Sequence, residues 1–89
     1  MQLVEYLKPL STTLRHALAA DCGTSYLHLR NIAFSGKSCG IQLAVDLERV
    51  TRKAVCRWDL RPDDWHRIWP ELVGTEGAPA VPAAHEVAA

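Results

Sequence analysis

Residues 15–34 decide the fold, and they read RHALAADCGTSYLHLRNIAF. Two helices that cross at a steep angle across a short turn need a small residue where they touch. Ala19 meets that need, and Gly23, four positions later, can take the positive φ that stops a helix. The positions that face back toward the core are apolar: Leu18, Cys22, Leu29 and Ile32. This spacing is typical of a helix-turn-helix.

Helical periodicity continues on both sides of this stretch. Apolar residues recur at intervals of three and four, which predicts helices over residues 2–7, 12–21, 25–34 and 41–51. Pro9 ends the first helix, and Ser11 or Thr12 caps the second. On the second helix, we expect the core-facing side to consist of Leu14, Ala17, Leu18 and Cys22.

The segment after residue 51 carries weaker signals. We expect Trp58, Leu60 and Pro62 in a tight turn, with Val55 reaching the core from an extended connection. A fifth short helix then begins near Asp63 and Asp64, whose charge suits the positive end of a helix dipole. Its apolar stripe packs against the preceding helices, with a dimer surface as the alternative, and consists of Trp65, Ile68, Trp69 and Leu72.

These elements predict an all-α fold, a compact bundle of about five short helices that contains a helix-turn-helix. A chain of 89 residues fits one domain, which we place at residues 1–72. Residues 73–89 are rich in Ala, Pro and Gly without apolar periodicity, so we expect a flexible tail.

Composition excludes several classes of protein. No run of 18 apolar residues is present, and the first residues lack the features of a secretion signal, so we expect a cytoplasmic protein without membrane contact. The three cysteines form no CxxC pair, which argues against a disulfide framework and against a structural metal site. No nucleophile, base or paired carboxylates have a supporting context, so we expect no enzyme activity, no cofactor and no small-molecule substrate.

The neutral net charge conceals an asymmetry along the chain. Residues 1–57 contain eight Lys or Arg and four Asp or Glu, a net charge of +4. Residues 58–89 contain two Lys or Arg and six Asp or Glu, a net charge of −4. The basic part can bind phosphates. The alternative interpretation is an ordinary solvated surface with an uneven charge distribution.

The chain resembles the Cro-like YdaS family of prophage-encoded regulators in four stretches: ADCGTS at 20–25, LRNIA at 29–33, LAVDLERVT at 43–51 and LRPDDW at 60–65. The resemblance implies a lambda-repressor/Cro-like fold and DNA binding, and some members are classed as antitoxins. At residues 37–40, KSCG replaces the more basic, proline-containing loop of that family.

On this interpretation, the helix at 25–34 enters the major groove of double-stranded DNA, which is wide enough for an α-helix. Arg30 can donate a bidentate pair to guanine, and Asn31 can do the same to adenine. The ring of Tyr26 can contact a thymine methyl group, and its hydroxyl has the alternative of donating to a phosphate. The predicted base-contacting residues are Ser25, Tyr26, Leu27, Arg30 and Asn31.

The best phosphate candidates flank the helix pair in sequence and are Arg15, Lys37 and Lys53. Arg49 and Arg52 instead have Asp46 and Glu48 as neighbours for pairing along the fourth helix. Because regulators of this kind place two recognition helices about 34–36 Å apart on a palindrome, we expect a homodimer on DNA.

Two functions follow from these observations. The first is a sequence-specific transcriptional regulator, a repressor of phage or prophage origin. The alternative is an antitoxin that binds a partner toxin through the acidic, tryptophan-containing C-terminal end. Both can coexist in one protein, because an antitoxin can also repress its own operon.

Overall fold

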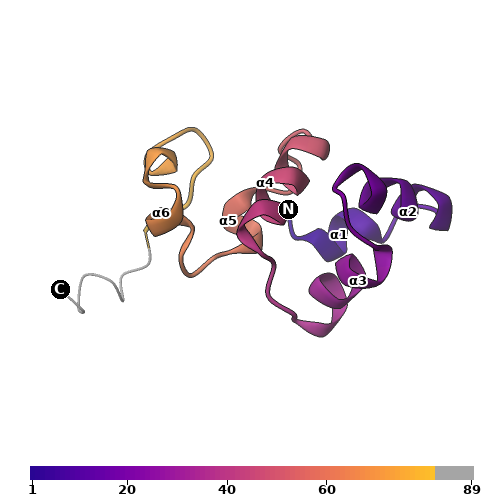
Figure 1. The fold of residues 1–89 in the computed structure, drawn as a ribbon. Helices are drawn as coiled ribbons and strands as arrows, with labels where there is room; N and C mark the ends of the chain where they lie inside the picture. The colour runs from indigo at the N-terminus through magenta and orange to yellow at the C-terminus, as the bar shows by residue number, and fades with distance from the viewer. Residues whose placement is uncertain (82–89) are drawn as a thin grey trace.

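A computed structural model describes residues 1–81 of the chain. Within this range the chain forms helices and turns without strands, which confirms the predicted all-α class. The elements are α1 (Leu3–Leu7), α2 (Thr12–Asp21), α3 (Tyr26–Ser35), α4 (Ile41–Val50), α5 (Arg57–Leu60), α6 (Trp65–Ile68) and the 3₁₀ helix η1 (Pro70–Leu72). Figure 1 shows α2 near one end of the molecule and α6 near the other. No helix within residues 1–81 combines the length and apolar character needed to cross a lipid bilayer.

The first four helices begin and end within one residue of the predicted bounds, because their caps are visible in the sequence. Ser11 precedes α2, and its hydroxyl accepts a hydrogen bond from the Leu14 amide at 3.2 Å. Ser25 plays the same part for α3, accepting from the His28 amide at 3.2 Å. Each cap satisfies one of the amides that a helix start leaves without an intrahelical acceptor.

The region after residue 55 differs from the prediction. Trp58 and Leu60, expected within a tight turn, belong to α5, and the Cys56 amide before this helix donates to the Asp59 carboxylate at 2.9 Å. The predicted fifth helix is split into α6 and η1. The split falls at Trp69 because the residue before a proline is kept out of the helical region, and Trp69 has φ −125° and ψ 69°.

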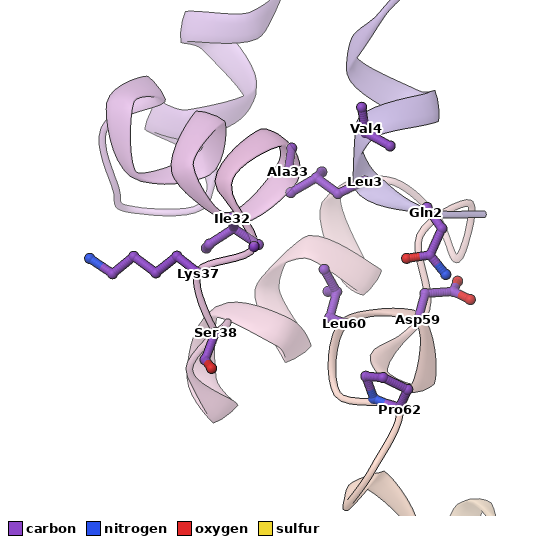
Figure 2. A pocket seen from close by; sticks show the side chains of 11 residues that line it. Gln2, Leu3, Val4, Ile32, Ala33, Lys37, Ser38, Asp59, Leu60 and Pro62 are labelled. Carbon is purple, nitrogen blue, oxygen red and sulfur yellow. The ribbon is translucent and has the colours of Figure 1, made fainter.

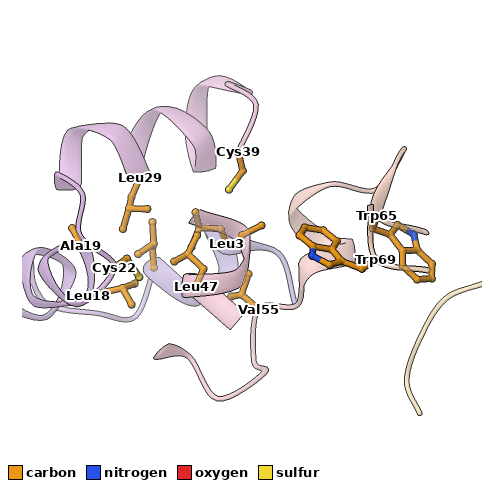
Figure 3. Packing of buried hydrophobic residues seen from close by; sticks show 12 residues of the cluster. Leu3, Leu18, Ala19, Cys22, Leu29, Cys39, Leu47, Val55, Trp65 and Trp69 are labelled. Atoms are coloured by element: carbon orange, nitrogen blue, oxygen red, sulfur yellow. The ribbon is translucent and has the colours of Figure 1, made fainter. Parts of the chain in front are cut away.

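The centre of the core is built from side chains of α1, α3 and α4 and of the connection after α4. Leu7, Leu29, Leu47 and Val55 are completely buried there. Val55 thus reaches the core from the connection between α4 and α5, as its isolated apolar character predicted. Figure 3 shows Leu29, Leu47 and Val55 converging, with Trp65 and Trp69 at one end of the same cluster.

The two buried tryptophans extend this core toward the C-terminal elements. The Trp58 and Trp65 rings meet edge to face with centroids 5.6 Å apart, and the Arg57 guanidinium lies 5.2 Å from the Trp69 ring. Ala78, in the segment predicted to be a flexible tail, is partly buried against the same cluster. The predicted tail residues 82–89 lie outside the described part of the chain.

Two residues predicted for the core side of α2 are in fact at the surface. Leu14 is 54% exposed and Ala17 is exposed, whereas Leu18, Ala19 and Cys22 are buried. The physical reason is the position of α2 at the edge of the molecule (Figure 1). Only its C-terminal half is covered by the rest of the protein. The apolar spacing extends into the N-terminal half, where no other part of the described chain covers the helix.

An ion pair holds the turn between α5 and α6. The Arg61 guanidinium forms two hydrogen bonds to the Asp64 carboxylate, at 3.1 and 2.6 Å, and a third to the Cys39 carbonyl. The turn is thereby tied to the loop that precedes α4. Hydrogen bonding to Arg61 lowers the pKa of Asp64 below its ordinary value of 3.8.

Replacing Asp64 with Asn should lower the free energy of unfolding by about 1 kcal/mol at pH 7. A carboxyl group whose pKa is lower in the folded state stabilises the fold above its ordinary pKa and loses that contribution as the pH falls. The difference between the two proteins should therefore shrink below about pH 4. Urea unfolding at pH 7, 5 and 3 measures this difference in the free energy of unfolding, with the exposed-site variant Glu71→Gln as control. An equal difference at all three pH values would contradict the prediction.

The C-terminus of α4 carries backbone strain. Arg52 and Lys53 have φ values of 54° and 67°, in the left-handed region that favours glycine. The Arg52 amide donates to the Arg49 carbonyl at 3.2 Å and the Lys53 amide to the Glu48 carbonyl at 2.8 Å. This is the bonding of a Schellman motif, with an arginine where glycine is the usual residue.

Replacing Arg52 with Gly should therefore raise the free energy of unfolding by about 0.5–1 kcal/mol, because glycine adopts positive φ without a Cβ clash. The matched control is Arg49→Gly inside α4, which should lower it by about 1 kcal/mol. Urea unfolding of both variants tests the pair. Destabilisation by Arg52→Gly would show that the arginine side chain contributes more than the strain removes.

Candidate nucleic-acid interface

The connection between α2 and α3 is a tight turn built around Gly23. Gly23 has φ +71°, and its amide donates to the Ala20 carbonyl at 3.0 Å. The Thr24 amide donates back to the Ala19 carbonyl at 2.9 Å. These two bonds form a Schellman motif, which ends α2 and turns the chain into α3 within four residues.

Ala19 is the small residue predicted to lie where α2 and α3 touch. It is 2% exposed and belongs to the core cluster, together with Leu18 and Cys22 on α2 and Leu29 on α3. Its neighbour Ala20 is exposed. The two adjacent alanines therefore sit in opposite environments on the same helix.

Replacing Ala19 with Leu should lower the free energy of unfolding by about 1–3 kcal/mol, because extra methylene groups overpack a filled space. The control Ala20→Leu adds the same atoms at the surface and should change the stability by less than about 0.5 kcal/mol. Thermal and urea unfolding measure both. Equal stabilities of the two variants would contradict tight contact at Ala19.

One side of α3 faces the core and the other faces solvent. Leu29 is completely buried, and Ile32 and Ala33 pack partly buried beside it. The opposite side, which we call the outer face of α3, follows helical spacing: Leu27 (61% exposed), Arg30 (exposed), Asn31 (partly buried) and Phe34 (49% exposed). The helix therefore presents a mixed apolar and polar surface.

The structure places the predicted base-contacting residues in three environments. Leu27, Arg30 and Asn31 share the outer face of α3. Ser25 is exposed at the start of the helix, where its hydroxyl oxygen caps the His28 amide. Tyr26 is partly buried and turned toward α2. The sequence prediction missed Phe34, although the spacing of seven from Leu27 indicates it.

The stretch of sequence that contains α3 carries positive charges only. Between Asp21 and Asp46 the chain contains no Asp or Glu. Arg30 and Lys37 lie in this stretch, and neither forms an ion pair within residues 1–81. In contrast, three other arginines are paired with carboxylates: Arg49 with Asp46, Arg57 with Glu48, and Arg61 with Asp64.

The three predicted phosphate-contacting residues lie in different places, and the first of them, Arg15, is engaged within the protein. Its guanidinium donates to the carbonyls of Leu7, Lys8 and Leu10 at 3.0–3.2 Å. It also donates to the Tyr26 hydroxyl at 2.9 Å. Arg15 thus joins the end of α1 to the first residue of α3.

Lys37 is exposed directly after α3, where Gly36 ends the helix with φ +72°. Lys37 also lines a pocket together with Leu3, Leu60 and Pro62, and Figure 2 shows the ammonium end of its side chain extending away from them. Lys53 lies elsewhere, in a groove beside Glu48 and residues 72–77 to which α3 contributes nothing. Of the three cations, Arg15 contacts α3 but its guanidinium is held by hydrogen bonds within the protein, and Lys53 lies away from α3. Lys37 follows α3 directly and forms no ion pair within residues 1–81.

Trp65 and Trp69, in the acidic C-terminal end, are not available as anchors for a partner protein. Trp65 is 1% exposed and Trp69 is 8% exposed, so both indoles belong to the core. Their burial agrees with the prediction that this stripe packs against the preceding helices.

The cysteines add no reactive group to this surface. Burial raises the pKa of Cys22 and Cys39 to about 11, so both stay protonated at neutral pH. Within residues 1–81 no group of three or more His, Cys, Asp or Glu side chains is arranged to hold a metal ion.

Comparison with known proteins gives no relative: no family model matches the chain, and no curated protein has a similar sequence. The resemblance to the YdaS family stays a prediction drawn from short stretches of residues.

Proposed function

We propose that this protein is a sequence-specific DNA-binding transcriptional regulator in which α2 and α3 act as a helix-turn-helix. The observation that carries the proposal is the outer face of α3. It is exposed, it carries Arg30 without an ion pair in residues 1–81, and it lies in a stretch of the chain without carboxylates. A helix with such a face suits the major groove, which combines acceptors, donors and thymine methyl groups.

Within this proposal, Arg30 reads guanine through two parallel hydrogen bonds to O6 and N7. Asn31, one residue further on the same face, pairs with adenine in the same manner. Leu27 covers thymine methyl groups, a part that its 61% exposure supports. Lys37 lies past the end of α3 and contacts the phosphate backbone rather than a base.

A single copy contributes few phosphate contacts, since Arg15 is occupied within the protein and Lys53 lies away from α3. We therefore propose that two copies bind a palindrome as a homodimer, with the two α3 helices one helical turn of DNA apart. A cytoplasmic repressor of this form needs neither cofactor nor metal ion. Tight binding of a monomer to an isolated half-site would contradict the dimer.

The test begins with selection of a preferred site from a random duplex pool, followed by binding measurements across a salt series. Arg30→Ala should weaken binding to the preferred site by about 1–3 kcal/mol and reduce the discrimination at one base pair. Lys37→Gln should weaken binding to all duplexes alike and reduce the salt slope by about 0.9.

The matched control is Arg67→Gln, which removes an exposed positive charge from α6, away from α3. This variant should bind as the unmodified protein does. Failure of the unmodified protein to bind any duplex at 50 mM salt, the low end of an ordinary salt series, would rule out the proposed function.

A further inference from the structure

The Tyr26 side chain is held between two residues of α2. The Arg15 guanidinium donates a hydrogen bond to its hydroxyl at 2.9 Å and lies 5.9 Å from the centre of its ring. The His16 ring approaches from the same helix, with centroids 5.1 Å apart and planes tilted by 56°. Tyr26 is the first residue of α3, so this contact fixes the start of the candidate recognition helix against α2.

Arg15 is itself fixed by the end of α1. The carbonyls of Leu7, Lys8 and Leu10 belong to the last turn of α1 and the loop after it, and all three accept hydrogen bonds from the guanidinium. Carbonyls at a helix end have no intrahelical donor. That of Leu7 also accepts from the Leu10 amide at 3.0 Å, and Arg15 supplies a donor to all three. Four hydrogen bonds in total leave Arg15 little freedom to reorient toward a ligand.

The direction of the Arg15–Tyr26 bond determines what the hydroxyl can do. A guanidinium only donates, so Tyr26 is the acceptor and its own O–H proton is not used in this bond. The positive charge beside the oxygen also makes the hydroxyl a better donor. The free proton is therefore suited to an anionic acceptor.

We propose that Tyr26 donates its hydroxyl proton to a DNA phosphate and that Arg15 is the positioning residue that orients it. The inference rests on the proposed function and assigns Arg15 a different part from the direct phosphate contact expected from sequence. A phosphate fits better than a base edge because Tyr26 is partly buried on the α2 side of α3, off the outer face that would enter the groove.

The experiment compares the full chain with Tyr26→Phe, Arg15→Gln and the double variant, on a preferred duplex and on a scrambled duplex. Tyr26→Phe removes one oxygen and leaves the three carbonyl bonds of Arg15 intact. It should weaken binding to both duplexes by a similar factor of about 3- to 10-fold. In the Arg15→Gln background, the same substitution should change the affinity by less than about 2-fold, because the hydroxyl is no longer oriented.

Circular dichroism and urea unfolding show whether each variant is folded at the temperature of the binding measurement. If Arg15→Gln does not fold, Tyr26→Phe alone still decides whether the hydroxyl binds phosphate. The control Lys37→Gln should add its effect to that of Tyr26→Phe without coupling, because the two act at separate phosphates.

Three outcomes would overturn the inference while the proposed function stands: unchanged binding by Tyr26→Phe, a loss confined to the preferred duplex, or a full Tyr26→Phe effect in the Arg15→Gln background. The second outcome would assign Tyr26 to a base, and the third would remove the positioning role of Arg15. Absence of duplex binding by the unmodified protein would instead refute the proposed function itself, and the inference with it.

Discussion

The left-handed turn at Gly23 is the constraint on which the rest of the structure depends. A residue with a Cβ resists φ +71°, so glycine allows α2 to stop after Asp21 and α3 to begin at Tyr26. The turn places the α3 side that carries Leu29 on the core. Arg30 lies about 100° further around the helix than Leu29, outside the side that the core covers, and it is exposed. The candidate interface is thus a consequence of how the core closes.

The parts of the fold that follow local rules could be predicted from sequence, and the parts set by distant partners could not. Ser11, Ser25 and Gly23 act within a few residues of themselves, so helix bounds near them are readable. The exposure of Leu14 depends on how α2 packs against the rest of the protein, which no local sequence pattern determines. The same holds for Arg15, whose acceptors lie up to eleven residues away and whose charge and position beside the helix pair predicted a phosphate contact.

The neutral total charge and a DNA-binding interpretation are compatible because the charges are separated along the sequence. Carboxylates pair with arginines on α4 and in the turns around α5, where they stabilise the C-terminal half. The stretch between Asp21 and Asp46 has none. Because screening limits the range of exposed charges to about 8 Å at physiological salt, local sign matters more than the sum.

The apolar residues on the outer face of α3 bear on the kind of surface it meets. Leu27 and Phe34 remain largely exposed in a domain whose size limits it to a thin core, so burying them would have been favourable. A protein interface would cover them, but Arg30 lies between them on the same face and would need a carboxylate partner once desolvated. A DNA groove supplies thymine methyl groups and guanine acceptors side by side. One ligand then satisfies the apolar and the cationic side chains of this helix together, which is why we favour DNA as the partner of α3.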